Sequence, residues 1–101
     1  MSSKVGAKLL AVDFEIYGKV QGVFFRKHTQ EKGTALGLRG WCMNTEEGTV
    51  RGSMEGEADK VEEMKTWLRT KGSPASRIDK AEFKNEKEIQ DFNYDGFTVR
   101  R

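Results

Sequence analysis

The spacing of hydrophobic residues changes between two periods along this chain, and the order of those changes restricts the fold. Near the start, four apolar residues alternate with other residues: Leu10, Val12, Phe14 and Ile16. This period of two predicts a strand with one buried face. A helical period follows from Phe25 to about Leu36, and Gly37 is expected to end that helix.

The same reading gives the remaining elements. Strands are predicted at 38–44 and 49–55, a helix at 58–71, and strands at 78–84 and 92–99. An interruption at Asp95-Gly96 is the alternative for the last strand. Residues 45–48 between two of the strands predict a hairpin turn, in which Gly48 takes the left-handed position. In the strand at 49–55, Arg51, Ser53 and Glu55 are expected to point outward. The charged run 84–88 is interpreted as a solvated turn.

This order of strands and helices is typical of one fold. It predicts a ferredoxin-like split βαβ sandwich of the α/β (α+β) class, with a mostly antiparallel sheet of four to five strands and two helices on one face. A chain of 101 residues fits one compact domain. We therefore expect a flexible N-terminus at 1–7 and a single domain at 8–101.

Composition excludes several classes of partner. The net charge of +2 is too small to indicate nucleic acid binding, and no apolar run is long enough to insert into a membrane. Cys42 is the single cysteine, so no internal disulfide can form. With no signal peptide in the sequence, we expect a soluble, cytoplasmic protein and take a monomer as the default for so small a domain.

The segment from Gly18 to Arg26 carries the clearest chemistry. Two glycines, Gly18 and Gly22, lie between a predicted strand and a predicted helix. Backbone N–H groups that converge at a helix N-terminus bind anions, and the planar guanidinium of Arg26 matches two phosphate oxygens. The simpler alternative is a tight turn followed by a solvated arginine. The segment lacks the motifs of nucleotide-binding loops, so nucleotide binding is disfavoured.

Two segments in the right order and at a fitting spacing now allow a comparison with a known family. Residues 18–26, Gly-Lys-Val-Gln-Gly-Val-Phe-Phe-Arg, and residues 40–50, Gly-Trp-Cys-Met-Asn-Thr-Glu-Glu-Gly-Thr-Val, resemble the two signatures of acylphosphatases. The likeness covers about residues 9–100. The residues 27–30, Lys-His-Thr-Gln, are similar to the common-type (erythrocyte) form.

The resemblance implies a hydrolase that cleaves the carboxyl–phosphate bond of acyl phosphates, with no cofactor and no metal. It implies that Arg26 anchors the phosphate and that Asn44 orients the attacking water. Backbone amides of the phosphate-binding loop are implied at Gln21, Gly22, Val23, Phe24 and Phe25. Gly18 is implied to shape the loop, and Thr45 to be a supporting neighbour. From the residues alone, Asn44 also fits a polar residue that starts a hairpin turn.

Other reactive residues are not assigned a role. His28 is expected to be a partly buried helix residue, and Cys42 a small core residue. The carboxylates are scattered, and no set has the spacing of metal ligands. The chain ends in Arg100-Arg101, where family members end in an aromatic residue, so a contact from the chain end to the loop is not carried over.

Two non-enzymatic alternatives remain. The same fold binds RNA on the open face of its sheet in RRM domains, but this needs exposed aromatic residues on the central strands. The predicted strand at 49–55 has none. An anion-binding domain without catalysis is the other alternative, and the presence of both Arg26 and Asn44 argues against it.

Overall fold

The computed structural model describes residues 8–100, so the N-terminal segment 1–7 and Arg101 lie outside the described residues. Five strands and two helices follow in the order β1 (Leu9–Lys19), α1 (Phe25–Ala35), β2 (Arg39–Asn44), β3 (Val50–Glu57), α2 (Ala58–Thr70), β4 (Arg77–Ile89) and β5 (Phe97–Arg100). This is the element order predicted from the sequence. No helix within residues 8–100 is both long and apolar enough to cross a bilayer.

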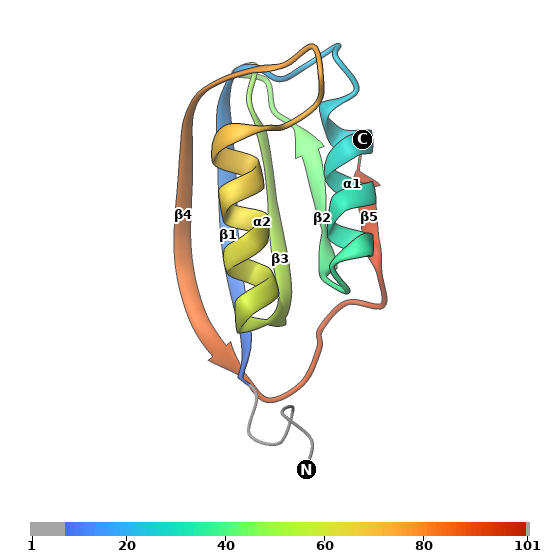
Figure 1. Ribbon diagram of the computed structural model, residues 1–101, viewed down its shortest axis with the longest axis vertical. Coiled ribbons are helices and arrows are strands. Elements are labelled where there is room, and N and C mark those ends of the chain that lie inside the picture. Colours follow the sequence, from blue (N-terminus) through green and yellow to red (C-terminus); the bar gives the residue numbers. More distant parts are fainter. Residues whose placement is uncertain (1–7, 101) are drawn as a thin grey trace.

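The five strands form one sheet in the order β4-β1-β3-β2-β5. The β1–β3, β1–β4 and β2–β3 pairs are antiparallel, and only the short β5 runs parallel to its neighbour β2. Both helices cover the same face, α2 over β1, β3 and β4, and α1 over β2 and β5 (Figure 1). The predicted ferredoxin-like α+β sandwich is confirmed.

The core lies between the sheet and the two helices. Val12, Phe14 and Ile16 of β1 are all buried, as their period of two predicted. Val61, Met64 and Leu68 of α2 meet them from the other side. In α1, Gly33 lets the helix pack against Phe97, because a Cβ at Gly33 would lie 2.7 Å from that ring. A glycine that weakens the helix by propensity is therefore required by its packing.

The interpretation of residues 84–88 as a solvated turn is wrong. β4 runs on to Ile89, and Lys87 and Glu88 pair with Ala11 and Leu10 of β1. Asn85 takes a left-handed φ of 58° where the register between the two strands shifts. Residues 84–88 are all exposed, and charge on an edge strand such as β4 discourages pairing with other molecules.

The last strand is shorter than predicted, since β5 begins at Phe97 and not at 92. The backbone N–H groups of Asn93 and Tyr94 donate to the Glu55 carboxylate and not to a neighbouring strand. Ser53 and Glu55 lie on the face away from the helices, as predicted, but both are buried there, whereas Arg51 is exposed.

Candidate active site

One end of the molecule gathers the segments that carry the predicted site residues. The loop between β1 and α1 and the carboxyl end of β2 lie at the upper end in Figure 1, and β5 rises toward the same end. A pocket of about 300 Å³ opens there. Its lining comes from the loop, α1, β2 and β5: Val20, Gly22, Phe24, Phe25, Arg26, Lys27, Gln30, Asn44 and Val99.

The loop turns from β1 into α1 through left-handed backbone conformations. The φ angle is 74° at Gly22 and 59° at Phe24. Phe24 is the N-cap residue of α1 and makes no capping hydrogen bond with its side chain, and the first turn of α1 contains no acidic residue. The first N–H groups of a helix have no acceptor within the helix. Here no side chain of residues 8–100 caps them, which suits the binding of an anion in the pocket.

Arg26 lies in the first turn of α1 and is half-buried. Its Nη1 donates to the carbonyl oxygen of Arg100 at 3.3 Å. The end of β5 therefore does contact the arginine of the loop, through a backbone carbonyl rather than an aromatic side chain. A guanidinium has five N–H donors, so this one hydrogen bond leaves most of them for a ligand.

Asn44 is the last residue of β2 and lines the same pocket as Arg26. Its Oδ1 is buried and accepts no hydrogen bond from residues 8–100. The turn that follows is closed by Thr45, whose Oγ1 accepts from the backbone N–H of Thr49 at 3.1 Å and whose N–H donates to the Thr49 carbonyl at 2.9 Å. Asn44 is thus not the side chain that forms the turn. This acceptor is therefore available to water or to a polar ligand in the pocket.

Gln21 joins the loop to that turn. Its Nε2 donates to the carbonyl oxygens of Thr45 and Thr49, each at 2.9 Å. The sequence assigned only the backbone amide of Gln21, and the contact of its side chain was missed. Thr49 in turn donates from Oγ1 to Glu15 Oε2 of β1 at 2.7 Å. The pairing of Thr45 with Thr49 across the predicted turn was the one signal in the sequence for this network.

The predicted site residues fall into two groups. Five of them line the pocket: Gly22, Phe24, Phe25, Arg26 and Asn44. Four do not: Gly18, Gln21, Val23 and Thr45. Val23 belongs to the buried core. Gly18 allows β4 to lie close to β1, because a Cβ at this position would lie 2.1 Å from the carbonyl oxygen of Arg77.

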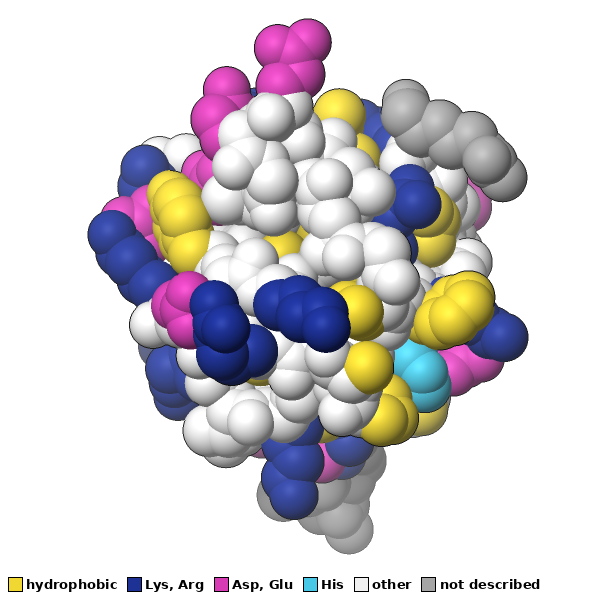
Figure 2. Space-filling view, turned by 90° about the horizontal axis from the view of Figure 1, so that it is seen from above, with side chains coloured by type: hydrophobic (Ala, Val, Ile, Leu, Met, Phe, Trp, Pro, Cys, Tyr) yellow, Lys and Arg dark blue, Asp and Glu magenta, His cyan; other side chains and the backbone are white. Residues whose placement is uncertain are grey.

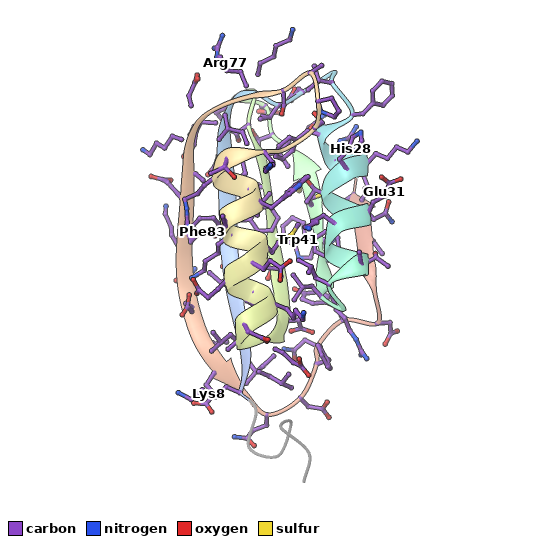
Figure 3. The ribbon with its side chains drawn as sticks, in the orientation of Figure 1. Lys8, His28, Glu31, Trp41, Arg77 and Phe83 are labelled. Atoms are coloured by element: carbon purple, nitrogen blue, oxygen red, sulfur yellow. The ribbon has the colours of Figure 1, made fainter. Side chains whose placement is uncertain are left out.

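The two other reactive side chains lie outside the pocket lining. His28 is half-buried on α1 with Nδ1 3.9 Å from Glu31 Oε1, and Figure 3 shows both on the helix below the loop. Burial raises the pKa of the Cys42 thiol to about 12, so the thiol is a poor nucleophile. Within residues 8–100, no group of three or more His, Cys, Asp or Glu side chains is arranged to hold a metal ion.

A second pocket, of about 280 Å³, lies on the face of the sheet away from the helices. Asp13, Glu15 and Arg51 are among the charged side chains of its lining, and no residue of the loop contributes to it. Trp41 also lines it, but the Arg100 guanidinium covers the indole ring at 4.2 Å and Nε1 donates to the hydroxyl of Tyr94. This ring is not a free platform for stacking a base, which disfavours the RNA-binding alternative.

Comparison with known proteins gives one consistent result. The acylphosphatase family model matches residues 12–99. The chain is 56% identical to human Acylphosphatase-1 over 94 residues, which cover 93% of this chain and 95% of the human protein. Among solved structures, an acylphosphatase from Coxiella burnetii has a TM-score of 0.80 at 33% identity, covering 99% of this chain and all of that one. One from Bacillus subtilis has a TM-score of 0.83 at 25% identity, covering 91% and 99%.

Fold and pocket together define a ferredoxin-like sandwich in which a strand–helix loop, an arginine and an asparagine line one cavity. The chain belongs to the acylphosphatase family and is an enzyme of that family. The resemblance to the common-type form agrees with the 56% sequence identity between this chain and human Acylphosphatase-1.

Proposed function

We propose that this enzyme hydrolyses acyl phosphates to a carboxylate and inorganic phosphate by attack of water on phosphorus, without a metal ion. The observation that carries the proposal is the meeting of Arg26 and Asn44 in one pocket with the loop at the N-terminus of α1. Phosphoryl transfer asks a protein mainly for positioning and for stabilisation of negative charge. Those are the two things that this pocket offers.

Charge stabilisation comes from Arg26 and the loop. Arg26 pairs with the phosphate oxygens, and the backbone amides of Gln21, Gly22, Val23, Phe24 and Phe25 form the rest of the cradle. The N-terminal end of α1 adds a partial positive charge. No acidic residue in the first turn of α1 offsets it. With this cradle the developing charge is stabilised by groups of the chain itself.

Asn44 holds the attacking water. Its Oδ1 accepts no hydrogen bond from residues 8–100, so it can accept one from water. An amide cannot take up the proton at neutral pH, and the proton passes to the substrate phosphate or to solvent. The leaving group is a carboxylate, which departs without a strong general acid. Gly18 shapes the loop and Thr45 holds the turn behind Asn44.

The proposal extends to a single domain that works as a cytoplasmic monomer. A monomer is the default for so small a domain, and the lone buried cysteine suits a reducing compartment. Light scattering of the active protein tests the monomer. A mass of two chains at assay concentration would contradict it.

The test of the reaction is hydrolysis of benzoyl phosphate by the purified protein with excess EDTA. We expect turnover to survive the chelator and to fall at least about 10²–10³-fold in Arg26→Gln, the loss typical of one preorganised donor. Arg69→Gln is the matched control, because Arg69 is exposed on α2, outside the pocket lining, and its guanidinium lies by Thr66 and over the ring of Phe83. Loss of turnover with EDTA refutes the metal-free reaction. If the wild type is folded but shows no turnover, the enzymatic proposal is wrong and the anion-binding domain is the remaining interpretation.

A further inference from the structure

Phe24 is exposed at the mouth of the candidate active site. The residue is 74% exposed, and within residues 8–100 it is the one large hydrophobic residue left so open to solvent. It lines the same pocket as Arg26 and Asn44. Figure 2 views the molecule from this end and shows hydrophobic side chains at the surface among basic ones.

The conformation of Phe24 is unfavourable for a phenylalanine. Its φ of 59° and ψ of 24° are left-handed, a region that glycine and asparagine adopt more readily. It also occupies the N-cap of α1, where Ser, Thr, Asp or Asn would supply a capping oxygen and Phe24 supplies none. Strained positions of this kind cluster at sites of ligand binding. An exposed ring with no packing role is therefore explained best by a ligand.

Other apolar residues of the pocket are less accessible. Val20 and Phe25 are each only 1% exposed, and Val99 is half-buried. A ligand with an apolar part meets the ring of Phe24 more readily than any of these. In the proposed reaction Arg26 holds the phosphate, so the acyl part has to extend toward the open side of the pocket, and the exposed Phe24 is the lining residue that offers it an accessible apolar surface.

We infer that Phe24 determines acyl-group selectivity, and that its ring packs on aromatic or other bulky apolar acyl groups. This inference rests on the proposed hydrolysis of acyl phosphates. Contact between the ring and an aryl group removes apolar surface of both from water, and paired rings gain further from offset or edge-to-face packing. An acetyl group is too small to cover the ring. Phe24 thereby favours benzoyl phosphate over acetyl phosphate.

The test compares kcat/KM for these two substrates in the wild type, Phe24→Ala and Phe24→Tyr. We expect the ratio of benzoyl to acetyl phosphate to fall about three- to tenfold in Phe24→Ala, as for loss of one aromatic contact. Phe24→Tyr, which retains the ring, should keep the ratio. Any change that the substitution causes in the loop backbone affects both substrates and cancels in the ratio. The side chain packs little in the free protein, so we expect the variants to fold.

Two further measurements sharpen the test. The ratio of the inhibition constants of phenylphosphonate and methylphosphonate measures the same preference at equilibrium. It therefore tests the inference even where the encounter of enzyme and substrate limits kcat/KM. Lys27→Ala is the matched control at the pocket, because Lys27 lines it with a charge that neither neutral acyl group engages. Ratios that stay unchanged in Phe24→Ala, or that fall equally in Lys27→Ala, overturn the inference while the hydrolysis stands. A wild type that hydrolyses neither substrate refutes the proposed function itself.

Discussion

The side chain of Gln21 donates two hydrogen bonds from one nitrogen, to the carbonyl oxygens of Thr45 and Thr49, each at 2.9 Å. These bonds fix the loop before α1 against the turn after β2. Arg26 follows the first segment and Asn44 precedes the second. The distance between the proposed phosphate anchor and the proposed water holder therefore depends on Gln21.

Replacing Gln21 should consequently lower turnover more than stability. In Gln21→Ala we expect kcat to fall about 10- to 100-fold, the effect of a displacement of about 1 Å at a reacting group. The free energy of unfolding should fall by only about 1–2 kcal/mol, since each hydrogen bond contributes about 1 kcal/mol net. Steady-state kinetics and urea unfolding on the same samples check this. Gln90→Ala, an exposed glutamine on the connection to β5, is the matched control. Equal turnover in the two variants would contradict the positioning role.

Asn44→Ala should separate binding from chemistry. The orphaned Oδ1 is lost, while Arg26 and the loop stay in place, so the inhibition constant of inorganic phosphate should change by less than about threefold. We expect kcat for benzoyl phosphate to fall about 10²–10³-fold, as for removal of a preorganised polar group. Arg26→Gln provides the contrast, because it should weaken phosphate inhibition and turnover together. Unchanged turnover in Asn44→Ala would rule out the water-holding role.

Local signals in the sequence predicted most of the fold. Alternation in β1, the helical period in α2 and the glycines at helix ends each act within a few residues, so one sequence sufficed. The predictions failed where contacts between residues far apart in the sequence determine the local structure. Asn93 and Tyr94 read as strand, but their N–H groups bind Glu55 of β3 instead. The run 84–88 read as a turn, but pairing with β1 makes it strand.

The candidate site also has features that the sequence predicted and features that it did not. Arg26 and Asn44 were identified from their motifs, and the structure brings them into one pocket. The hydrogen bond from Arg26 to the carbonyl oxygen of Arg100 was not predicted, because the residue type does not indicate where a backbone carbonyl lies. The exposure of Phe24 was missed because a phenylalanine next to a helix start predicts burial. A single sequence cannot distinguish an aromatic residue held in solvent from one in the core.

Gly18 should be intolerant of any side chain. Its φ is 128°, and a Cβ would lie 2.1 Å from the carbonyl oxygen of Arg77 and 2.8 Å from the N–H nitrogen of Asp79. These are backbone atoms of β4 that cannot move without loss of pairing with β1. Gly18→Ala should lower the free energy of unfolding by about 3 kcal/mol or more. Gly96→Ala, where a Cβ meets nothing within 4 Å, should stay within about 0.5 kcal/mol of the wild type. Similar urea midpoints for both variants would contradict the steric argument.

Cys42 should be unreactive in the folded protein. Burial raises the pKa of its thiol to about 12 from the ordinary 9.0, although the nearby charge of Arg26 acts in the opposite direction. At about pH 8 the native thiol therefore carries almost no thiolate, which is the reactive form. Labelling by a disulfide reagent should be slow in the native state and rapid in guanidinium chloride. Native labelling at the rate of a free thiol would contradict this.

The same shift predicts a dependence of stability on pH. Above the pKa of the unfolded thiol, the unfolded chain has lost a proton that the folded chain keeps, so the folded state is progressively disfavoured. Stability should fall as pH rises from about 9 toward 12, the two values that bound the shift. Cys42→Ala removes this dependence, whereas groups shared by both proteins, such as Tyr17, contribute equally to each. Urea midpoints across this range should therefore decline more steeply in the wild type than in Cys42→Ala, and parallel declines would show that Cys42 does not titrate differently in the two states.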